Sequence, residues 1–543
     1  MGPEAIAMKA LTTNKTLLGS LVALLLIVAT GLFLQRDYMN EFPTHIHAWA
    51  EQDHYALTIG FMNNGFDFFH PETMIYNKQF PGWWKEAYDT TITSVDFPIH
   101  EYIVALLMKL LGTTSPWVFR LWTLLWAFLG LFFLYKTTNR ITGSWMKSAL
   151  VTAVALTSPV YTYYMNGFLP SIPALSLGII GFWFYLKYYD SNLRKHFHLS
   201  IAFLTLAMLM RTTFAIELIA ILCFELLRIF RKETSFLDKL PSVLISAALF
   251  VAYFLWNKHL SDLYGTIFLN ELLPPEDWQD AKELVADTYT TWRFQYFQRA
   301  QYLVFLIIAL AAIGVSIYQS VKNKKEQVAS KKPLSLWWLP LIEIFGCLLF
   351  SVAMMQQLPY HDYYLLDTFF LPFILLIALT LNILPTNQDR TYSQGLCYIF
   401  GVACAIMVTG ASKSQGERRF IEDKAVIPYL CYQDSNKLLD SLDVPLDARI
   451  LCLYGYAQNG PFIQMGRKGY TMFEDNEELF LTALTWDYDY IVIENNKFIK
   501  YFDTRRELLS RLKKIGGNDK ITVCIPTNNW VYQADWQFFY PAK

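Results

Sequence analysis

Residues 17–34 read LLGSLVALLLIVATGLFL, an apolar run without a charge that follows Lys9 and Lys15. The run is too long for the core of a signal peptide and lacks a small-residue cleavage site, which indicates an uncleaved membrane anchor. Lysines before such an anchor favour a cytoplasmic N-terminus. We therefore expect the chain to enter a membrane at this segment.

The same pattern repeats along the next several hundred residues. The chain has 543 residues, of which 54% are hydrophobic and 17% charged, whereas an average soluble protein has about 25% charged residues. Uncharged apolar blocks recur as far as residue 411, which is typical of a polytopic membrane protein. The net charge of −1 gives no global attraction to nucleic acid, so we expect no nucleic-acid partner. The seven scattered cysteines form neither a disulfide framework nor a zinc motif.

The apolar blocks predict eleven membrane-spanning helices. Residues 98–111 are not among them, because fourteen helical residues extend about 21 Å and the hydrocarbon core is about 30 Å thick. We expect this segment to be a helix in the outer interface. The predicted spans are 17–34, 116–135, 148–165, 170–187, 197–210, 213–230, 241–257, 300–320, 335–354, 361–384 and 393–411.

Loop charges orient these spans. The segments assigned to the cytoplasm are basic, whereas residues 36–96 contain nine acidic and three basic side chains, as the positive-inside rule requires. The predicted domains are therefore a transmembrane domain, 1–411, with outer loops at 36–115 and 258–299, and an extracytoplasmic domain, 412–543.

The tail has a different pattern from the membrane part. Residues 448–454, 488–494 and 521–526 are apolar runs typical of buried strands, and residues 475–486 and 504–514 have helical patterns. Strands that alternate with helices predict a small α/β domain. The predicted fold is thus a polytopic α-helical membrane protein with interfacial helices in its first outer loop and an extracytoplasmic α/β domain.

The first candidate site is a helix that begins near Ala48. Helical spacing puts Glu51, Tyr55 and Met62 on one side, while Asp53 points elsewhere. A partly desolvated carboxylate has a raised pKa, which suits the deprotonation of an acceptor hydroxyl. The alternative is an amphipathic interfacial helix whose glutamate simply faces water.

A second cluster lies at the head of the predicted interfacial helix. Asp96 and His100 could share a face there, whereas Glu101 adjoins His100. Five of the nine histidines lie in the first outer loop, residues 36–115, so a divalent metal ion held by Asp96 and His100 is one possibility. No tight ligand spacing accompanies them.

Two arginines lie at the expected outer ends of spans. Arg211 separates two apolar runs, and Arg120 opens another. Arginine binds phosphate through a planar fork of donors, although it also snorkels to lipid headgroups. A further polar group begins the tenth span, where Asp367 lies inside the apolar run. That group comprises His361, Asp362, Tyr363 and Tyr364.

All these side chains are expected at one face of the membrane, and that convergence favours a common site. Glycine-rich phosphate loops, nucleophile elbows and ATP motifs are absent from the sequence. The free energy for a reaction would then arrive with an activated substrate.

The order of these features resembles the GT-C superfamily of membrane glycosyltransferases, and in particular the protein O-mannosyltransferases and the lipid A aminoarabinose transferases. The likeness extends over most of residues 17–385. The matching features are Glu51, Tyr55, Ala56, Met62, Asp67 and Phe68 after the first span, DFPIHEYIVALLMKLLG ending at Gly112, Arg120 in SPWVFRL, the SPVYTYYMNGFLPSIPAL stretch, and HDYYLLDTFFLP.

This resemblance implies transfer of a sugar from a polyprenyl phosphate on the extracytoplasmic side. Glu51 takes the position of the catalytic base, and Arg211 that of a donor-phosphate ligand, with His361 and Tyr363 nearby. The family's usual base is Asp, so Asp53 is a rival. Asp96 lies near the place where aminoarabinose transferases have a phosphate-binding lysine, so either Arg211 alone or a bridging metal ion would bind the phosphate.

We therefore expect an inverting glycosyltransferase of the plasma (inner) membrane. Its donor is a polyprenyl-phosphate-linked sugar, and its acceptor is a lipid, a glycan or a protein. Glu51 or Asp53 would be the base, and membrane lipids surround the spans. The donor phosphate would lie against Arg211, His361, Tyr363 and Tyr364, and the substrate cavity would include Tyr55, Asp96, His100, Glu101 and Arg120. A transporter or flippase of lipid-linked sugars is an alternative, as is an oligosaccharide transferase or polymerase with a polyprenyl-diphosphate donor.

Overall fold

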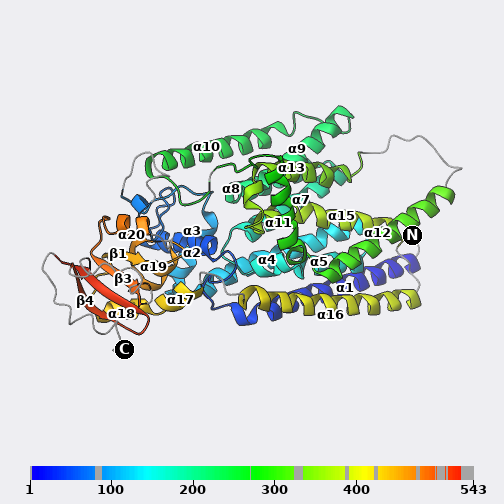
Figure 1. Ribbon diagram of the computed structural model, residues 1–543. Coiled ribbons are helices and arrows are strands. Elements are labelled where there is room, and N and C mark those ends of the chain that lie inside the picture. Colours follow the sequence, from blue (N-terminus) through cyan, green and yellow to red (C-terminus); the bar gives the residue numbers. More distant parts are fainter. Residues whose placement is uncertain are drawn as a thin grey trace. The chain divides into compact units, whose positions relative to one another are not determined.

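The structure is a computed structural model, and its residues form two compact units (Figure 1). The helical unit comprises Met1–Met39, Arg120–Tyr253 and Glu271–Glu417, and the sheet unit comprises Asn40–Phe119, Phe254–Asn270 and Arg418–Lys543. Each unit is therefore assembled from segments that are far apart in the sequence. The described residues are 3–79, 89–269, 271–322, 334–385, 390–420, 426–472, 477–495, 497, 508 and 511–527.

Every predicted span coincides with a helix or a pair of helices. Among the described residues, four helical stretches are long and apolar enough to cross a membrane, namely Leu17–Tyr38, Pro116–Thr142, Leu240–Tyr264 and Arg299–Val321. The total of eleven spans and their orientation stay predictions. The helices are α1 (Pro3–Gln35), α4 (Pro116–Thr142), α5 (Trp145–Leu156), α6 (Pro159–Tyr164), α7 (Ser171–Ser191), α8 (Arg194–Met210), α9 (Ala215–Phe230), α10 (Leu240–Tyr264), α11 (Trp278–Tyr296), α12 (Arg299–Lys322), α13 (Trp338–Ala353), α14 (Tyr363–Thr368), α15 (Phe370–Ile383) and α16 (Arg390–Phe420), with short 3-10 turns η1 (Arg36–Tyr38), η3 (Thr212–Phe214) and η4 (Met355–Gln357).

Two predicted spans are each broken into two helices near a proline. The segment 148–165 divides into α5 and α6, with Pro159 as the first residue of α6. The segment 361–384 divides into α14 and α15, with Pro372 in the first turn of α15. Proline has no backbone N–H and fits the first turn of a helix, where that donor needs no partner.

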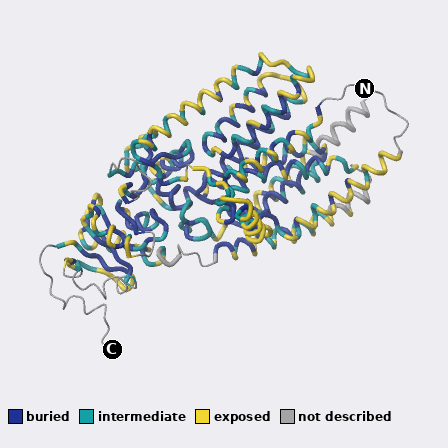
Figure 2. Tube along the Cα trace, turned by 45° about the horizontal axis from the view of Figure 1, so that its top comes forward, coloured by how far each residue is buried: buried dark blue, intermediate teal, exposed yellow. Residues whose placement is uncertain are grey.

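Helices of the helical unit approach one another closely where small residues lie between them. A Cβ atom on Gly181 of α7 would come within 2.7 Å of Cγ of Leu204 on α8, so the contact requires glycine. Large apolar side chains such as Leu25, Ile245 and Leu306 are more than half exposed. Figure 2 shows exposed residues along the length of α10. Apolar surface of this extent is typical of contact with lipid.

The sheet unit contains a five-stranded mixed sheet in the order β2-β1-β3-β5-β4. β1 pairs in parallel with β2 and β3, whereas β5 pairs antiparallel with β3 and β4. The strands are β1 (Arg449–Leu453), β2 (Lys468–Thr471), β3 (Tyr490–Glu494), β4 (Leu512–Gly517) and β5 (Ile521–Pro526), and the helices of this unit are α2 (Ala48–Asn63), α3 (Ile99–Leu111), α17 (Val426–Tyr432), α18 (Ser435–Ser441), α19 (Gly460–Met465) and α20 (Glu477–Ala483), with the 3-10 turn η2 (Asn77–Gln79).

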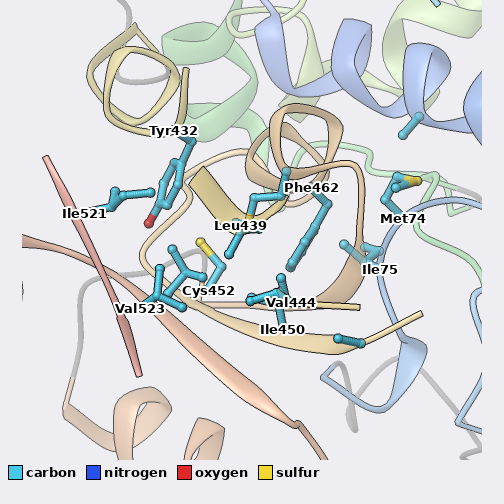
Figure 3. Close-up of a cluster of buried hydrophobic side chains, with 14 of the residues drawn as sticks. Met74, Ile75, Tyr432, Leu439, Val444, Ile450, Cys452, Phe462, Ile521 and Val523 are labelled. Atoms are coloured by element: carbon cyan, nitrogen blue, oxygen red, sulfur yellow. The ribbon is translucent and has the colours of Figure 1, made fainter. Parts of the chain in front are cut away.

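Side chains alternate between two cores, one on each face of the sheet. Leu451 and Ile491 belong to one core, while Ile450 and Val492 belong to the other. The second core also contains Ala56 of α2, together with Met74 and Ile75 from the segment after α2 (Figure 3). The first outer loop and the C-terminal segment therefore share one hydrophobic core.

The segment after α2 also extends the sheet beyond its edge strand β2. Tyr76 N–H donates to the Gly469 carbonyl at 2.9 Å, and Gly469 N–H donates to the Met74 carbonyl at 3.0 Å. The predicted boundary at residue 411 separates membrane-embedded residues from soluble ones, and it stays a prediction.

The α/β character of the tail is confirmed. The three predicted strands are β1, β3 and β5, and α20 lies inside the predicted helix 475–486. The predicted helix 504–514 is wrong at its end, because residues 512–514 begin β4 and pair with β5; most of its remainder lies outside the described residues. The sequence reading also missed β2, a short strand that contains Gly469.

Candidate functional site

Helix α2 carries the first group of candidate residues and begins after a left-handed residue. His47 has φ 59° and ends the preceding turn, after which the helix runs from Ala48 to Asn63. The predicted helix is confirmed, but its carboxylates do not face water. Glu51 and Asp53 are each 3% exposed, so the water-facing alternative for Glu51 is wrong.

Asp53 is held by the amide of Asn459. Nδ2 of Asn459 donates to Oδ1 of Asp53 at 2.7 Å, and Asn459 is itself fully buried. Burial raises the pKa of Asp53 from its ordinary 3.8 to about 8, although hydrogen bonds from Asn459 and Trp49 act in the opposite direction. At neutral pH this carboxyl is mostly protonated.

The neighbouring helix α3 contributes a buried pair with α2. Nδ1 of His54 lies 2.7 Å from Oε1 of Glu101, and both side chains are buried. Burial raises the pKa of Glu101, but the hydrogen bond and charge of His54 outweigh it, so the pKa lies below its ordinary value. We call Glu51, Asp53, His54 and Glu101 the α2 cluster.

His100 does not join this pair as a ligand group. Its ring packs against Phe119, with ring centroids 5.0 Å apart. Burial lowers the pKa of His100 to about 4, so its imidazole is neutral at physiological pH. Among the described residues, no group of three or more His, Cys, Asp or Glu side chains could hold a metal ion. A two-residue site at Asp96 and His100 stays a prediction.

Two predicted cavity residues are tied to backbone carbonyls. In the sheet unit, the Tyr55 hydroxyl donates to the carbonyl of Thr114. In the helical unit, Nη1 of Arg120 donates to the carbonyl of Asn166 at 3.0 Å. The guanidinium of Arg120 also lies over the Phe168 ring, 4.5 Å from its centroid. These contacts order the local backbone, and their role in a substrate cavity stays a prediction.

Arg211 lies where α8 ends and the turn before α9 begins. Its Nε donates to Oδ2 of Asp367 at 2.7 Å. The guanidinium lies over the rings of Tyr363 and Tyr364, at 5.1 and 5.6 Å from their centroids. The structure therefore brings Arg211 together with both predicted tyrosines, and we call Arg211, Asp367, Tyr363 and Tyr364 the Arg211 cluster.

The Arg211 guanidinium has a nitrogen, Nη2, besides the Nε that donates to Asp367. This atom, Nη2, is buried and makes no hydrogen bond to any part of the chain that the structure describes. Buried donors are nearly always paired in folded proteins. An anionic oxygen is the kind of acceptor that pairs with such a donor, and Oδ1 of Asp367 is likewise buried without a hydrogen bond among the described residues.

His361 adjoins the Arg211 cluster at the start of α14. Its ring lies 5.3 Å from that of Tyr363, and its Nδ1 lies 3.2 Å from the Gln357 carbonyl. Asp362 accepts a hydrogen bond from the Tyr164 hydroxyl at 2.8 Å. The predicted polar group at 361–364 is therefore anchored around Arg211.

The sequence reading missed three partners. In the sequence, Asp367 is an ionisable residue inside an apolar run, and such a residue by itself indicates a functional site. His54 is one of five histidines in the first outer loop, and only the fold brings it to Glu101. Asn459 lies about four hundred residues from Asp53, and no pattern in the sequence links the two.

Known proteins share this architecture. The sequence profile of a family described as dolichyl-phosphate-mannose-protein mannosyltransferase matches residues 96–256. The structure of ArnT from Cupriavidus metallidurans bound to undecaprenyl phosphate is similar, with a TM-score of 0.54, 11% identity, and coverage of 92% of this chain and 97% of that one. Arabinofuranosyltransferase AftD from Mycobacteria matches with a TM-score of 0.51 and 11% identity over 94% of this chain but only 40% of its own.

Among curated proteins, no sequence matches the chain significantly. The structural likenesses concern the fold, and the profile match concerns the segment from the head of α3 to α10. Together they confirm the predicted resemblance: the chain has the fold of the GT-C membrane glycosyltransferases, and part of its sequence matches one of their families.

Proposed function

We propose that the chain is an integral-membrane glycosyltransferase that moves a sugar from a polyprenyl-phosphate donor to an acceptor on the extracytoplasmic side of the inner membrane. The observation that carries this proposal is Arg211, a half-buried side chain whose buried nitrogen Nη2 has no acceptor among the described residues. A phosphate oxygen satisfies such a donor, because charge-assisted pairs of this kind are short and strong. The ArnT relative has undecaprenyl phosphate bound.

In this proposal the Arg211 cluster holds the donor phosphate. Asp367 occupies one edge of the fork and fixes its plane, while Tyr363 and Tyr364 support its face. As the bond to the anomeric carbon breaks, negative charge grows on the leaving phosphate. A preorganised cation stabilises that charge without reorganising at the moment of reaction.

The proposed base is Glu51. It removes a proton from the acceptor hydroxyl, whose oxygen then forms a bond to the anomeric carbon as polyprenyl phosphate leaves. One displacement of this kind inverts the anomeric centre. Asp53 is the less suitable base, since it already accepts a hydrogen bond from Asn459 and is mostly protonated at neutral pH.

The test uses purified protein in detergent with a panel of polyprenyl-phosphate donors that carry mannose, arabinofuranose or aminoarabinose. We expect one donor to release polyprenyl phosphate in the presence of acceptor. The sugar product should have the opposite anomeric configuration to the donor. Binding of donors without any release, together with movement of donor across a vesicle bilayer, would instead identify a flippase.

The donor panel should include a polyprenyl-diphosphate sugar. Preference for the diphosphate donor would replace this proposal with the oligosaccharide transferase alternative. Addition of a chelator to the same assay tests the predicted metal ion at Asp96 and His100. If the chelator stops release and a divalent cation restores it, the metal is required.

A further inference from the structure

One face of α2 is buried against the C-terminal segment of the sheet unit. Positions 49, 52, 53 and 56 recur at helical spacing and lie on this face. Ala56 belongs to the core that contains Ile450 and Phe462. Glu51 and Tyr55 lie on the opposite side of the helix. The C-terminal segment therefore contacts the helix from behind its candidate base.

The contact is closest at the turn before α19. Nδ2 of Asn459 donates to Oδ1 of Asp53 at 2.7 Å. Its Oδ1 accepts the backbone N–H of Met74 at 3.0 Å. A single buried amide thus joins α2 to the segment that follows it, and both of its polar atoms are used.

Further contacts join α2 to this turn. A Cβ atom on Gly460 would come within 2.2 Å of Oε1 of Gln52. The ring of Trp49 meets that of Tyr456 edge to face, with centroids 6.0 Å apart. Gln52 is in turn fixed by its Nε2, which donates to the Pro43 carbonyl at 2.6 Å. Several side chains on this face of α2 therefore contact the C-terminal segment or the loop before the helix.

We propose that the C-terminal α/β segment sets the orientation of Glu51, and that Asn459 is the positioning residue through which it does so. This inference rests on the proposed function only for its catalytic consequence. In this arrangement Asp53 is the acceptor of the Asn459 hydrogen bond and is not the base. The α/β segment contributes geometry to the reaction without contacting the substrate itself.

The first experiment needs no substrate. Hydrogen–deuterium exchange of the α2 amides is measured by mass spectrometry in the full-length protein and in Asn459→Asp at pH 9, above the pKa of about 8 for Asp53, so that the variant places two carboxylates opposite each other. We expect exchange in α2 to rise about ten-fold, since a buried hydrogen bond typically changes an equilibrium constant by about that factor. The exposed Asn436→Ala in α18 is the matched control and should leave α2 exchange unchanged.

A reciprocal exchange supplies the rescue. In Asp53→Asn combined with Asn459→Asp, the amide introduced at position 53 donates to the carboxylate introduced at position 459, whose second oxygen still accepts from Met74. This double variant should regain the wild-type protection of α2. Exchange in α2 that is the same in the wild type and in Asn459→Asp would overturn the proposal, and so would a double variant no better protected than Asn459→Asp.

The transfer assay then separates positioning from a purely structural role. For Asn459→Asp we expect kcat to fall at least ten-fold with KM for the donor within about two-fold, and the double variant to recover kcat. A double variant that is protected but inactive would show that Asp53 itself takes the proton, which contradicts the inference. If the wild type transfers no sugar from any donor, the proposed function fails, while the exchange measurement still decides whether Asn459 orients α2.

Discussion

The α2 cluster and the Arg211 cluster are both buried groups of charge, but they are satisfied in opposite ways. In the α2 cluster, carboxyl groups predominate, and a histidine and an amide serve two of them. In the Arg211 cluster one cation meets one carboxylate and two aromatic faces, and among the described residues Nη2 of Arg211 has no acceptor and Oδ1 of Asp367 has no donor. The first arrangement is rich in carboxyl oxygens, and the second is built around a cation.

This contrast indicates which reactant is chemically suited to each cluster. Carboxyl groups suit a proton-bearing hydroxyl, whereas a guanidinium suits a phosphate. Each variant described below removes one side of the comparison and measures what is lost.

The largest effect is expected from Glu51→Gln. The variant loses the base but keeps a side chain of the same shape, so transfer should fall by about a thousand-fold or more. Its elution in size-exclusion chromatography and its thermal unfolding, followed by tryptophan fluorescence, should match the wild type. Asp53→Asn is the matched comparison and should retain most activity. The reverse pattern, with Glu51→Gln active and Asp53→Asn inactive, would move the base to Asp53.

The next effect concerns the donor phosphate. Arg211→Gln combined with Asp367→Asn removes both members of the ion pair, so that no unpaired charge is left buried. We expect the affinity for undecaprenyl phosphate to fall about ten- to hundred-fold, the range for a hydrogen bond to a charged group. Binding is measured by microscale thermophoresis in detergent. The exposed Asn436→Ala in α18 is the control and should keep the affinity, because it leaves the ion pair in place. Equal binding by the double variant and the wild type would exclude Arg211 as the phosphate ligand.

A third variant tests how the buried acidic side chains of the α2 cluster are stabilised. His54→Ala leaves the Glu101 carboxylate buried without its partner, and removal of one member of a buried pair costs about 3 kcal/mol or more. The unfolding temperature should therefore fall. Adding Glu101→Gln to His54→Ala should recover part of the loss, because the charge is then gone. An unchanged unfolding temperature in His54→Ala would mean that this pair does not hold α2 against α3.

The last test concerns the dependence of stability on pH. Asp53 has a pKa of about 8 in the folded chain and an ordinary value of 3.8, so the folded state binds the extra proton between these values. Its contribution to stability is complete below about pH 4 and is lost as the pH rises towards 8. Relative to Asp53→Asn, the wild type should lose unfolding temperature over that interval and then level off. A constant difference from pH 5 to pH 8 would show that Asp53 titrates normally.

The helices and strands could largely be predicted from the sequence, because apolar blocks and loop charges are local signals. The membrane helices coincide with those blocks, and β1, β3 and β5 coincide with buried runs. The exceptions have local causes as well. The sequence predicts a helix over the first residues of β4. The residues of β4, LKKIGG, become a strand only through pairing with β5. Pro159 divides one predicted span into α5 and α6.

The candidate residues were also visible in the sequence, as was the grouping of Arg211 with Tyr363 and Tyr364, but the hydrogen-bonded pairs were not. Glu51 and Arg211 stand out as charges beside apolar runs, where burial is costly. The pairing of Arg211 with Asp367 spans 156 residues, and that of Asp53 with Asn459 spans 406. Contacts at such separations leave no periodic signal in the sequence, since each depends on how whole elements pack. The sequence by itself determined the kind of protein and its charged residues, and only the tertiary structure decided which buried charge is held by which partner.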